Sequence, residues 1–164
     1  MNKKFKPFFK WSGGKSKEFD RIVKWVPKDY HTYYEPFVGG GAIWLGLDPK
    51  KAVIGDFCDE VTNFYDVLKS EGRSFINECN EISDAYNKLI KDNVTVSKSK
   101  KEGKKQFKPA ADIYYHWRSL HNLQGKEKAK RFFVLRCLSY GGMLRFNSKG
   151  EFNVPYGFYK SLKK

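Results

Sequence analysis

Short apolar runs and amphipathic segments alternate in the first third of the chain. Apolar residues recur at helical spacing over 19–26, and Pro27 ends that segment. Residues 33–41 form a short apolar run followed by glycines, which is typical of a strand that enters a tight turn. A helix start at 42–47 and a second apolar run at 51–55 follow. The pattern therefore predicts a strand, a glycine turn, a helix and a second strand in succession.

Beyond these elements the pattern changes to helices. Apolar residues at intervals of three and four predict further helices at 61–68, 75–90, 110–121 and 128–138. Residues 144–154 alternate around Asn-Ser-Lys-Gly, which predicts a β-hairpin with Gly150 at positive φ. Two strands are too few for a stable parallel sheet, which is normally buried on both faces. We therefore expect an incomplete α/β fold, with strands missing from this chain.

A lysine-rich stretch divides the chain. Residues 98–108 carry six lysines and one acid, a composition typical of an exposed loop. We therefore expect three parts: a Rossmann-like part at 1–90, a lysine-rich loop at 91–109, and a helical and hairpin region at 110–164.

The net charge narrows the choice of partner. The 164 residues include 32 Lys and Arg against 18 Asp and Glu, which gives a net charge of +14. The positive residues cluster at 98–108 and 126–136, and this clustering favours duplex DNA over a chain that is merely basic and soluble. The basic run is not interleaved with apolar residues at helical spacing, so we do not expect a membrane as partner.

The cysteines and histidines predict no metal centre. Cys58, Cys79 and Cys137 have neither zinc-site nor disulfide spacing, and the histidines stand apart from any paired cysteines. No apolar run approaches the roughly 18 residues of a membrane span. The N-terminus lacks the apolar core of a signal peptide. We therefore expect a cytoplasmic protein without bound metal.

The glycine turn is the strongest chemical signal in the sequence. Gly39, Gly40 and Gly41 let backbone approach a ligand closely, because no Cβ intervenes. Asp56 lies 17 residues after Gly39, a spacing typical of an acid that binds ribose hydroxyls. The dinucleotide pattern G-x-G-x-x-G is absent and Trp44 is bulky, which disfavours NAD or FAD and favours S-adenosylmethionine. An ordinary strand–turn–helix remains the alternative.

Several segments follow the order found in one family. They are Trp-Ser-Gly-Gly-Lys at 11–15, Tyr-Glu-Pro-Phe-Val-Gly-Gly-Gly at 34–41, Ile-Gly-Asp at 54–56, Tyr114 and Tyr115 with Arg118 and Asn122, and Asn-Ser-Lys-Gly-Glu-Phe-Asn-Val-Pro-Tyr-Gly at 147–157. On these segments the chain resembles the N-terminal part of a Dam-type adenine-specific DNA methyltransferase. The resemblance implies an incomplete Rossmann-like, S-adenosylmethionine-dependent methyltransferase fold plus a helical and β-hairpin DNA-recognition region.

The resemblance implies a cofactor site in the first part of the chain. Trp11 would offer a ring face to the sulfonium or the adenine, Lys15 would pair with the methionine carboxylate, and Asp56 would accept ribose hydroxyls. A core position is the alternative for Trp11. The implied cofactor-binding residues are Trp11, Lys15, Phe37, Gly39, Gly40, Gly41 and Asp56.

The resemblance also implies a reader of a short site in duplex DNA, such as GATC. Arg145 would contact a guanine edge, with an ion pair to Glu151 as the alternative. Tyr140 would fill space beside an extruded base, and Lys149 would contact phosphate. The implied DNA-binding residues are Tyr140, Arg145, Asn147, Lys149 and Tyr159.

The sequence departs from the family pattern at three points. Gly141 and Phe158 stand where Asn and Arg are usual, which leaves the recognition site open. The catalytic Asp-Pro-Pro-Tyr motif is absent, because no two of the six prolines are adjacent. The chain is thus half of a split enzyme whose second chain supplies the catalytic strands, a fragment of a longer enzyme, or a non-catalytic binder of DNA or cofactor. A basic architectural DNA-binding protein is a fourth, unrelated alternative.

Overall fold

A computed structural model describes residues 7–93 and 108–162, which divide into two compact units, Met1–Thr62 and Asn63–Lys164. The division falls inside a helix, between Thr62 and Asn63. Most of the lysine-rich loop expected at 91–109 lies outside the described residues.

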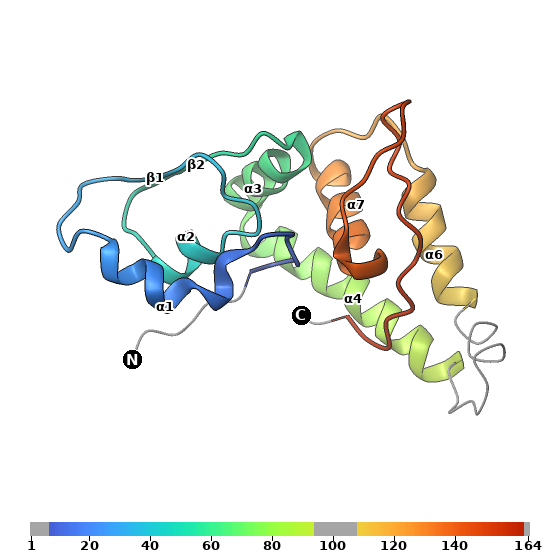
Figure 1. The fold of residues 1–164 in the computed structure, drawn as a ribbon. Coiled ribbons are helices and arrows are strands. Elements are labelled where there is room, and N and C mark those ends of the chain that lie inside the picture. The colour runs from blue at the N-terminus through green and yellow to red at the C-terminus, as the bar shows by residue number, and fades with distance from the viewer. Residues whose placement is uncertain (1–6, 94–107, 163–164) are drawn as a thin grey trace. The chain divides into compact units, whose positions relative to one another are not determined.

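The first unit contains the predicted strand, glycine turn, helix and strand. Its elements are η1 (Lys15–Lys17), α1 (Phe19–Ile22), η2 (Val23–Trp25), β1 (Tyr33–Glu35), α2 (Ala42–Leu47) and β2 (Ala52–Ile54). β1 and β2 run parallel and side by side, with Tyr34 opposite Val53 (Figure 1). The order predicted from the apolar runs is therefore confirmed, in a mixed fold whose sheet has two strands in the described chain.

The two faces of this small sheet differ. Tyr34 and Val53 are cross-strand neighbours, and both are exposed, at 69% and 51%. The core of the unit lies elsewhere and includes Phe19, whose ring packs on α2 so closely that a Cβ at Gly46 would lie 2.2 Å from it. A parallel sheet is normally covered on both faces, so the sheet of this unit is only partly buried.

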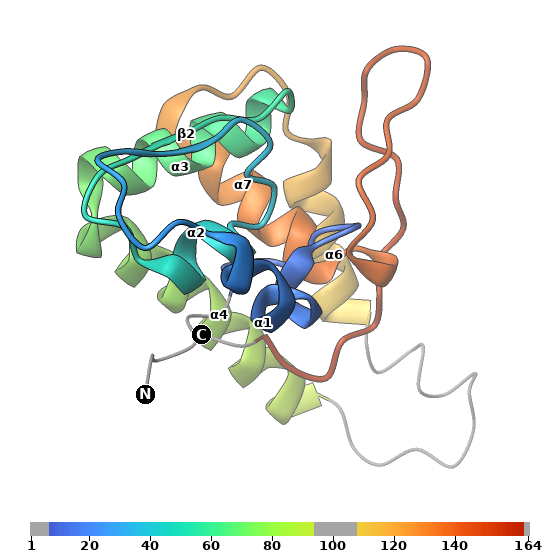
Figure 2. The ribbon, with the colours of Figure 1, turned by 60° about the vertical axis from the view of Figure 1, so that its left-hand side comes forward.

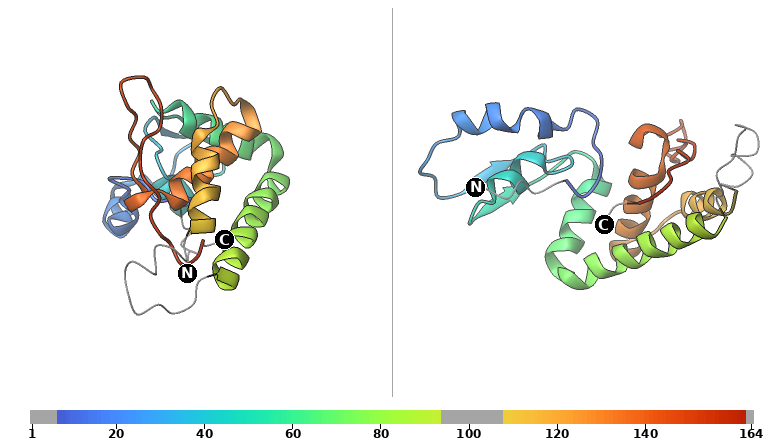
Figure 3. Two further views of the ribbon diagram at one scale, coloured as in Figure 1. Left: turned by 90° about the vertical axis from the view of Figure 1, so that its right-hand side faces the viewer. Right: turned by 90° about the horizontal axis from the view of Figure 1, so that it is seen from below.

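The second unit is helical. Helix α3 (Asp59–Glu71) leads into it, followed by α4 (Arg73–Asn93), α6 (Lys108–Ser119), α7 (Gly125–Leu138) and the 3-10 turn η3 (Tyr140–Gly142). Helix α6 packs on α7, and both contact α4 (Figure 3). The core includes Phe64, whose ring lies 5.3 Å from that of Phe75 and 6.1 Å from that of Phe132. The four helices predicted from apolar periodicity are confirmed within a few residues at each end.

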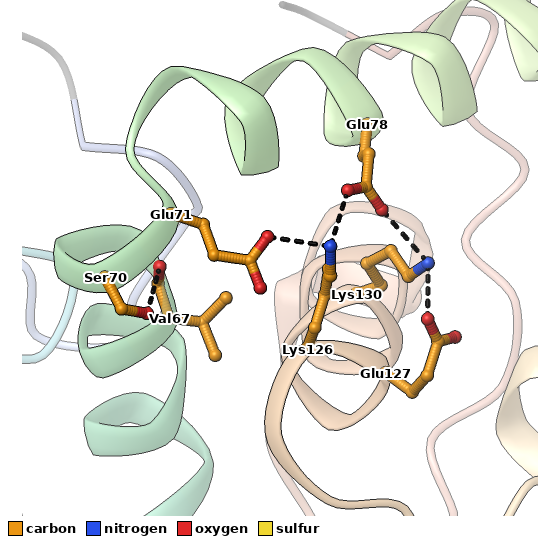
Figure 4. A network of polar contacts seen from close by, with 7 residues as sticks. All are labelled: Val67, Ser70, Glu71, Glu78, Lys126, Glu127 and Lys130. Atoms are coloured by element: carbon orange, nitrogen blue, oxygen red, sulfur yellow. Dashed lines mark hydrogen bonds and ion pairs between the residues drawn. The ribbon is translucent and has the colours of Figure 1, made fainter.

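An ion-pair network joins the helices of the second unit. Lys126 Nζ lies 2.7 Å from Glu71 and 2.9 Å from Glu78, while Lys130 Nζ lies 3.3 Å from Glu78 and 2.5 Å from Glu127 (Figure 4). The hydrogen bonds that Lys126 donates to Glu71 and Glu78 raise the pKa of Lys126, and those that Lys126 and Lys130 donate to Glu78 lower the pKa of Glu78. The network ties α7 to the end of α3 and to α4.

Four of the five basic residues at 126–136 contact other groups of the protein or are buried. Lys126 and Lys130 are engaged in the network, and Arg131 donates to the backbone carbonyls of Trp117 and Arg118. Arg136 is 1% exposed. The ion pairs of Lys126 and Lys130 and the hydrogen bonds of Arg131 join α7 to neighbouring segments of the second unit.

The C-terminal segment is hydrogen-bonded to α4. The Tyr86 hydroxyl contacts the Tyr156 hydroxyl and donates to the Tyr159 carbonyl at 2.5 Å. The side-chain amide of Asn87 donates to the Leu162 carbonyl at 2.9 Å and accepts from its N–H at 2.7 Å. These bonds fix the chain on the C-terminal side of the predicted hairpin.

Within the described ranges, no helix combines the length and apolar character needed to cross a membrane.

Candidate functional site

The glycine turn of the first unit lies against Trp11. A Cβ at Gly39 would stand 2.6 Å from two atoms of the Trp11 indole, and Gly39 has a φ of +48°. Gly40 packs on the same side chain, since its Cβ would lie 3.2 Å from that of Trp11. The turn therefore requires glycine for contact with the protein's own tryptophan, whether or not a ligand also approaches.

Asp56 joins the end of β2 to the same turn. Its Oδ2 accepts a hydrogen bond from the Gly39 N–H at 2.8 Å, and its Oδ1 accepts one from the Cys58 N–H at 2.9 Å. A carboxylate offers about four lone-pair positions, so both oxygens retain acceptor capacity. Three predicted segments, far apart in the sequence, thus meet at Gly39.

Glu35 is a residue of this site that the sequence analysis did not single out. Its Oε2 accepts from the Tyr33 hydroxyl at 3.0 Å and from the Trp44 N–H at 3.1 Å. Because Gly41, the N-cap of α2, has no side chain, the acid at the end of β1 caps the first turn of the helix in its place. Burial raises the pKa of Glu35. Glu35 could have been identified in the sequence by its position directly before the Pro-Phe-Val and glycine run.

Lys15 and Phe37 are more open than the residues around Gly39. Lys15 donates to the carbonyl of Gly13 at 2.7 Å, and its side chain remains 53% exposed. Phe37 lies between β1 and the glycine turn and is 79% exposed. Both side chains can therefore meet a ligand, whereas Trp11 and Asp56 already contact Gly39.

In the second unit, residues 144–154 form the predicted hairpin, which extends beyond the helices of that unit (Figure 2). Phe146 and Phe152 are bridge partners, and their rings meet edge to face with centroids 5.8 Å apart. Gly150 has a φ of +75°, as predicted from the turn sequence. An aromatic pair thus holds the two arms together below the tip.

Asn147 builds the turn of this hairpin. Its Oδ1 accepts from the backbone N–H groups of Lys149 and Glu151 at 3.0 and 2.9 Å, and its Nδ2 donates to the Glu151 carboxylate at 2.8 Å. These contacts use one of the two amide hydrogens of Asn147. Lys149 is exposed at the tip.

Arg145 is bound to Asn153 across the hairpin. Its Nε donates to Asn153 Oδ1 at 2.8 Å, and its Nη2 lies 3.4 Å from the Asn153 carbonyl oxygen. The alternative ion pair with Glu151 does not form, because Glu151 binds Asn147 instead. Arg145 remains exposed, so the rest of its guanidinium faces solvent.

The two tyrosines implied in DNA binding have different surroundings. Tyr140 is 60% exposed, and its N–H donates to the Pro155 carbonyl at 2.8 Å. The Tyr159 hydroxyl donates to the Ser139 carbonyl at 3.2 Å, and its ring lies over Gly157. Tyr140 is therefore open to a ligand, while Tyr159 also contributes to the packing of the C-terminal segment.

A strand–glycine turn–helix–strand unit with an acid after its second strand is an arrangement found in many nucleotide-binding α/β proteins. In this chain it is followed by a helical unit that carries a hairpin. The chain belongs to the D12 class of N6 adenine-specific DNA methyltransferases, because the family model of that class matches residues 11–164. The Dam-type resemblance is thereby confirmed.

Three relatives illustrate the similarity. The chain is 33% identical over 162 residues to the type II methyltransferase M1.LlaDCHI of Lactococcus lactis subsp. cremoris and 33% identical over 172 residues to the type II methyltransferase M.MjaIII of Methanocaldococcus jannaschii. It is 29% identical over 163 residues to the DNA adenine methylase of Escherichia coli K12. Each alignment covers 96% of this chain but 50%, 54% and 50% of these relatives, so the chain spans about half of their length.

We predict that Gly39→Ala destabilises the first unit by about 1–3 kcal/mol, because the new methyl group overlaps Trp11 in a backbone conformation that disfavours a side chain. Gly13→Ala is the matched control, since Gly13 has a φ of +73° and nothing within 4 Å of its Cβ position. Urea unfolding measures both. In a Trp11→Ala background, Gly39→Ala should lower the free energy of unfolding only as much as the control substitution does. An undiminished cost there would show that Trp11 is not the cause.

Proposed function

We propose that this chain is the cofactor-binding and DNA-recognising part of a site-specific DNA adenine-N6 methyltransferase. A polypeptide equivalent to the remaining half of its relatives supplies the catalytic strands, either in a longer chain or as a second chain. The observation that carries the proposal is the junction at Gly39, where Trp11 packs on the glycine turn and Asp56 accepts its N–H.

The residues around this junction fit S-adenosylmethionine. Asp56 retains lone pairs for the two ribose hydroxyls, and Trp11 and Phe37 offer aromatic surface to adenine or to the sulfonium cation. Lys15 is exposed and supplies a cation for the methionine carboxylate. When bound, this cofactor provides the electrophilic methyl group for transfer.

Incomplete cover of the sheet supports the need for further strands. Tyr34 and Val53 face solvent side by side on a two-stranded parallel sheet, which is too small to be stable without additional strands or helices. The sequence contains no Asp-Pro-Pro-Tyr motif to receive the target amino group and stack on a flipped adenine. Both observations fit a chain that holds half of an active site.

The hairpin of the second unit suits the recognition of a short site in duplex DNA, of the GATC type. Arg145 presents its outer guanidinium nitrogens to a guanine edge, where a two-bond contact is favoured. Lys149 at the tip contacts phosphate, and the exposed ring of Tyr140 fills space beside an extruded base.

A non-catalytic protein that binds DNA or S-adenosylmethionine is the second candidate. The absence of two adjacent prolines anywhere in the sequence favours it, because the motif that would activate the adenine is not present. The two candidates differ in whether added catalytic strands produce a methyltransferase.

We predict that the 164-residue chain alone transfers no methyl group to DNA. Loss of the positioning and electrostatic groups of a catalytic motif lowers rates by orders of magnitude. Radiolabelled S-adenosylmethionine and duplex DNA provide the assay, with the full-length E. coli DNA adenine methylase as positive control. Label incorporation by the pure chain above background would contradict the prediction.

Binding of S-adenosylmethionine should depend on Asp56. We predict that Asp56→Ala weakens binding by about 1–3 kcal/mol, because it removes the acceptor for the ribose hydroxyls. Asp56→Asn, which retains one acceptor oxygen, should lose less. Calorimetry measures the affinities, and thermal unfolding of each variant separates this effect from loss of the Gly39 and Cys58 hydrogen bonds. Equal affinity of wild type and Asp56→Ala would remove Asp56 from the site.

Arg145 and Lys149 should contribute differently to DNA binding. We predict that Arg145→Ala costs about 1–3 kcal/mol on the preferred duplex and almost nothing on a scrambled one. Lys149→Ala should weaken both duplexes alike and reduce the log–log salt slope by about 0.9, the value for one phosphate contact. Arg73→Ala, an exposed arginine at the start of α4, is the control. Equal weakening of both duplexes by Arg145→Ala, with reduced thermal stability, would assign Arg145 to the hairpin alone.

A further inference from the structure

We propose that Asn153 is a positioning residue that holds the Arg145 guanidinium in the orientation needed to read a base edge. The inference rests on the proposed function of the hairpin in DNA recognition. Its basis is the pair of contacts from Arg145 Nε to Asn153 Oδ1, at 2.8 Å, and from Arg145 Nη2 to the Asn153 carbonyl, at 3.4 Å.

The contacts leave one particular side of the guanidinium open. An arginine has five N–H donors in a planar fork, and a guanine edge takes two parallel donors. Asn153 occupies the side formed by Nε and Nη2, so these contacts leave the side formed by Nη1 and Nη2 to a ligand. Because two atoms of one residue hold the group, rotation about the last bonds of the Arg145 side chain is restricted before DNA binds.

Asn153 is itself held firmly by the fold. Its N–H donates to the Arg145 carbonyl at 3.0 Å. The next residue, Val154, is fully buried, and its carbonyl accepts from the Tyr114 hydroxyl at 2.8 Å and from Arg118 Nη1 at 3.2 Å. Hydrogen bonds from helix α6 therefore fix the backbone at 153 and 154 and, through Asn153, the position of Arg145, although the hairpin tip protrudes.

An amide is suited to this function beside a polyanion. Asn153 Oδ1 accepts the Nε hydrogen without adding negative charge, whereas a carboxylate at the same place would repel nearby phosphates. An asparagine that read adenine directly would need its Oδ1 for the base, but here Arg145 takes that atom. The arrangement therefore assigns Asn153 to the orientation of the arginine rather than to base contact.

A double-mutant cycle tests the inference with the full 164-residue chain. The probes are the duplex that the wild-type chain enriches from a random-sequence pool and the same duplex with its consensus scrambled. We expect Asn153→Ala to lower the ratio of affinities for the two duplexes roughly three- to tenfold, the range for one lost hydrogen bond, with no change on the scrambled duplex. In an Arg145→Ala background the same substitution should have no further effect on the ratio.

Two more variants complete the experiment. Asn153→Asp keeps the acceptor, so it should preserve the ratio while weakening binding to both duplexes. Asn77→Ala, which removes an exposed amide on α4, should change neither quantity. Thermal unfolding accompanies each measurement, and Asn153→Gln, which displaces the amide by one methylene, replaces Asn153→Ala if that variant unfolds.

The possible failures are distinct. The positioning function is overturned if Arg145→Ala lowers the affinity ratio but loss of the Asn153 amide does not. It is also overturned if loss of the Asn153 amide lowers the ratio by the same factor with and without Arg145. In both cases base reading by Arg145 stands. If the wild-type chain enriches no consensus, or if Arg145→Ala leaves the ratio unchanged, the proposed recognition function of the hairpin is overturned and the inference falls with it.

Discussion

The backbone of Gly39 is held from two sides, and the arrangement of the first unit depends on this position. Trp11 packs where a side chain would otherwise stand, and Asp56 accepts the N–H of the same residue. The loop before α1, the end of β1 and the end of β2 are thereby brought to one point. Glu35 completes the arrangement, because it caps α2 where the glycine N-cap cannot. The groups that we propose for cofactor binding are thus also the groups that hold the turn in shape.

In the second unit, some basic side chains support the packing of the helices and others face outward. Lys126 and Lys130 bind glutamates of neighbouring helices, and Arg136 is buried. Arg145 and Lys149 instead lie on the hairpin, where Asn147 forms the turn and the aromatic pair below it holds the arms together. The number of lysines and arginines therefore does not measure how many of them face a partner, since some bind glutamates or are buried.

The relationship to DNA adenine methyltransferases also accounts for the shape of the first unit. A parallel sheet depends on cover from both faces, and here Tyr34 and Val53 remain open on one of them. The chain spans about half the length of its curated relatives. We propose that the strands that would extend this sheet also carry the catalytic motif, and we therefore attribute the chemistry to additional strands.

Periodicity and turn signals were sufficient to predict the order of strands and helices and the hairpin with Gly150, because these depend on interactions between residues close in the chain. They could not show that Trp11 lies on Gly39, that Glu35 caps α2, or that Asn153 rather than Glu151 binds Arg145. Nor could they show which lysines of α7 are neutralised by glutamates of other helices. Those contacts join residues that only folding brings together, and the choice among several chemically similar partners is made by distance and direction in three dimensions.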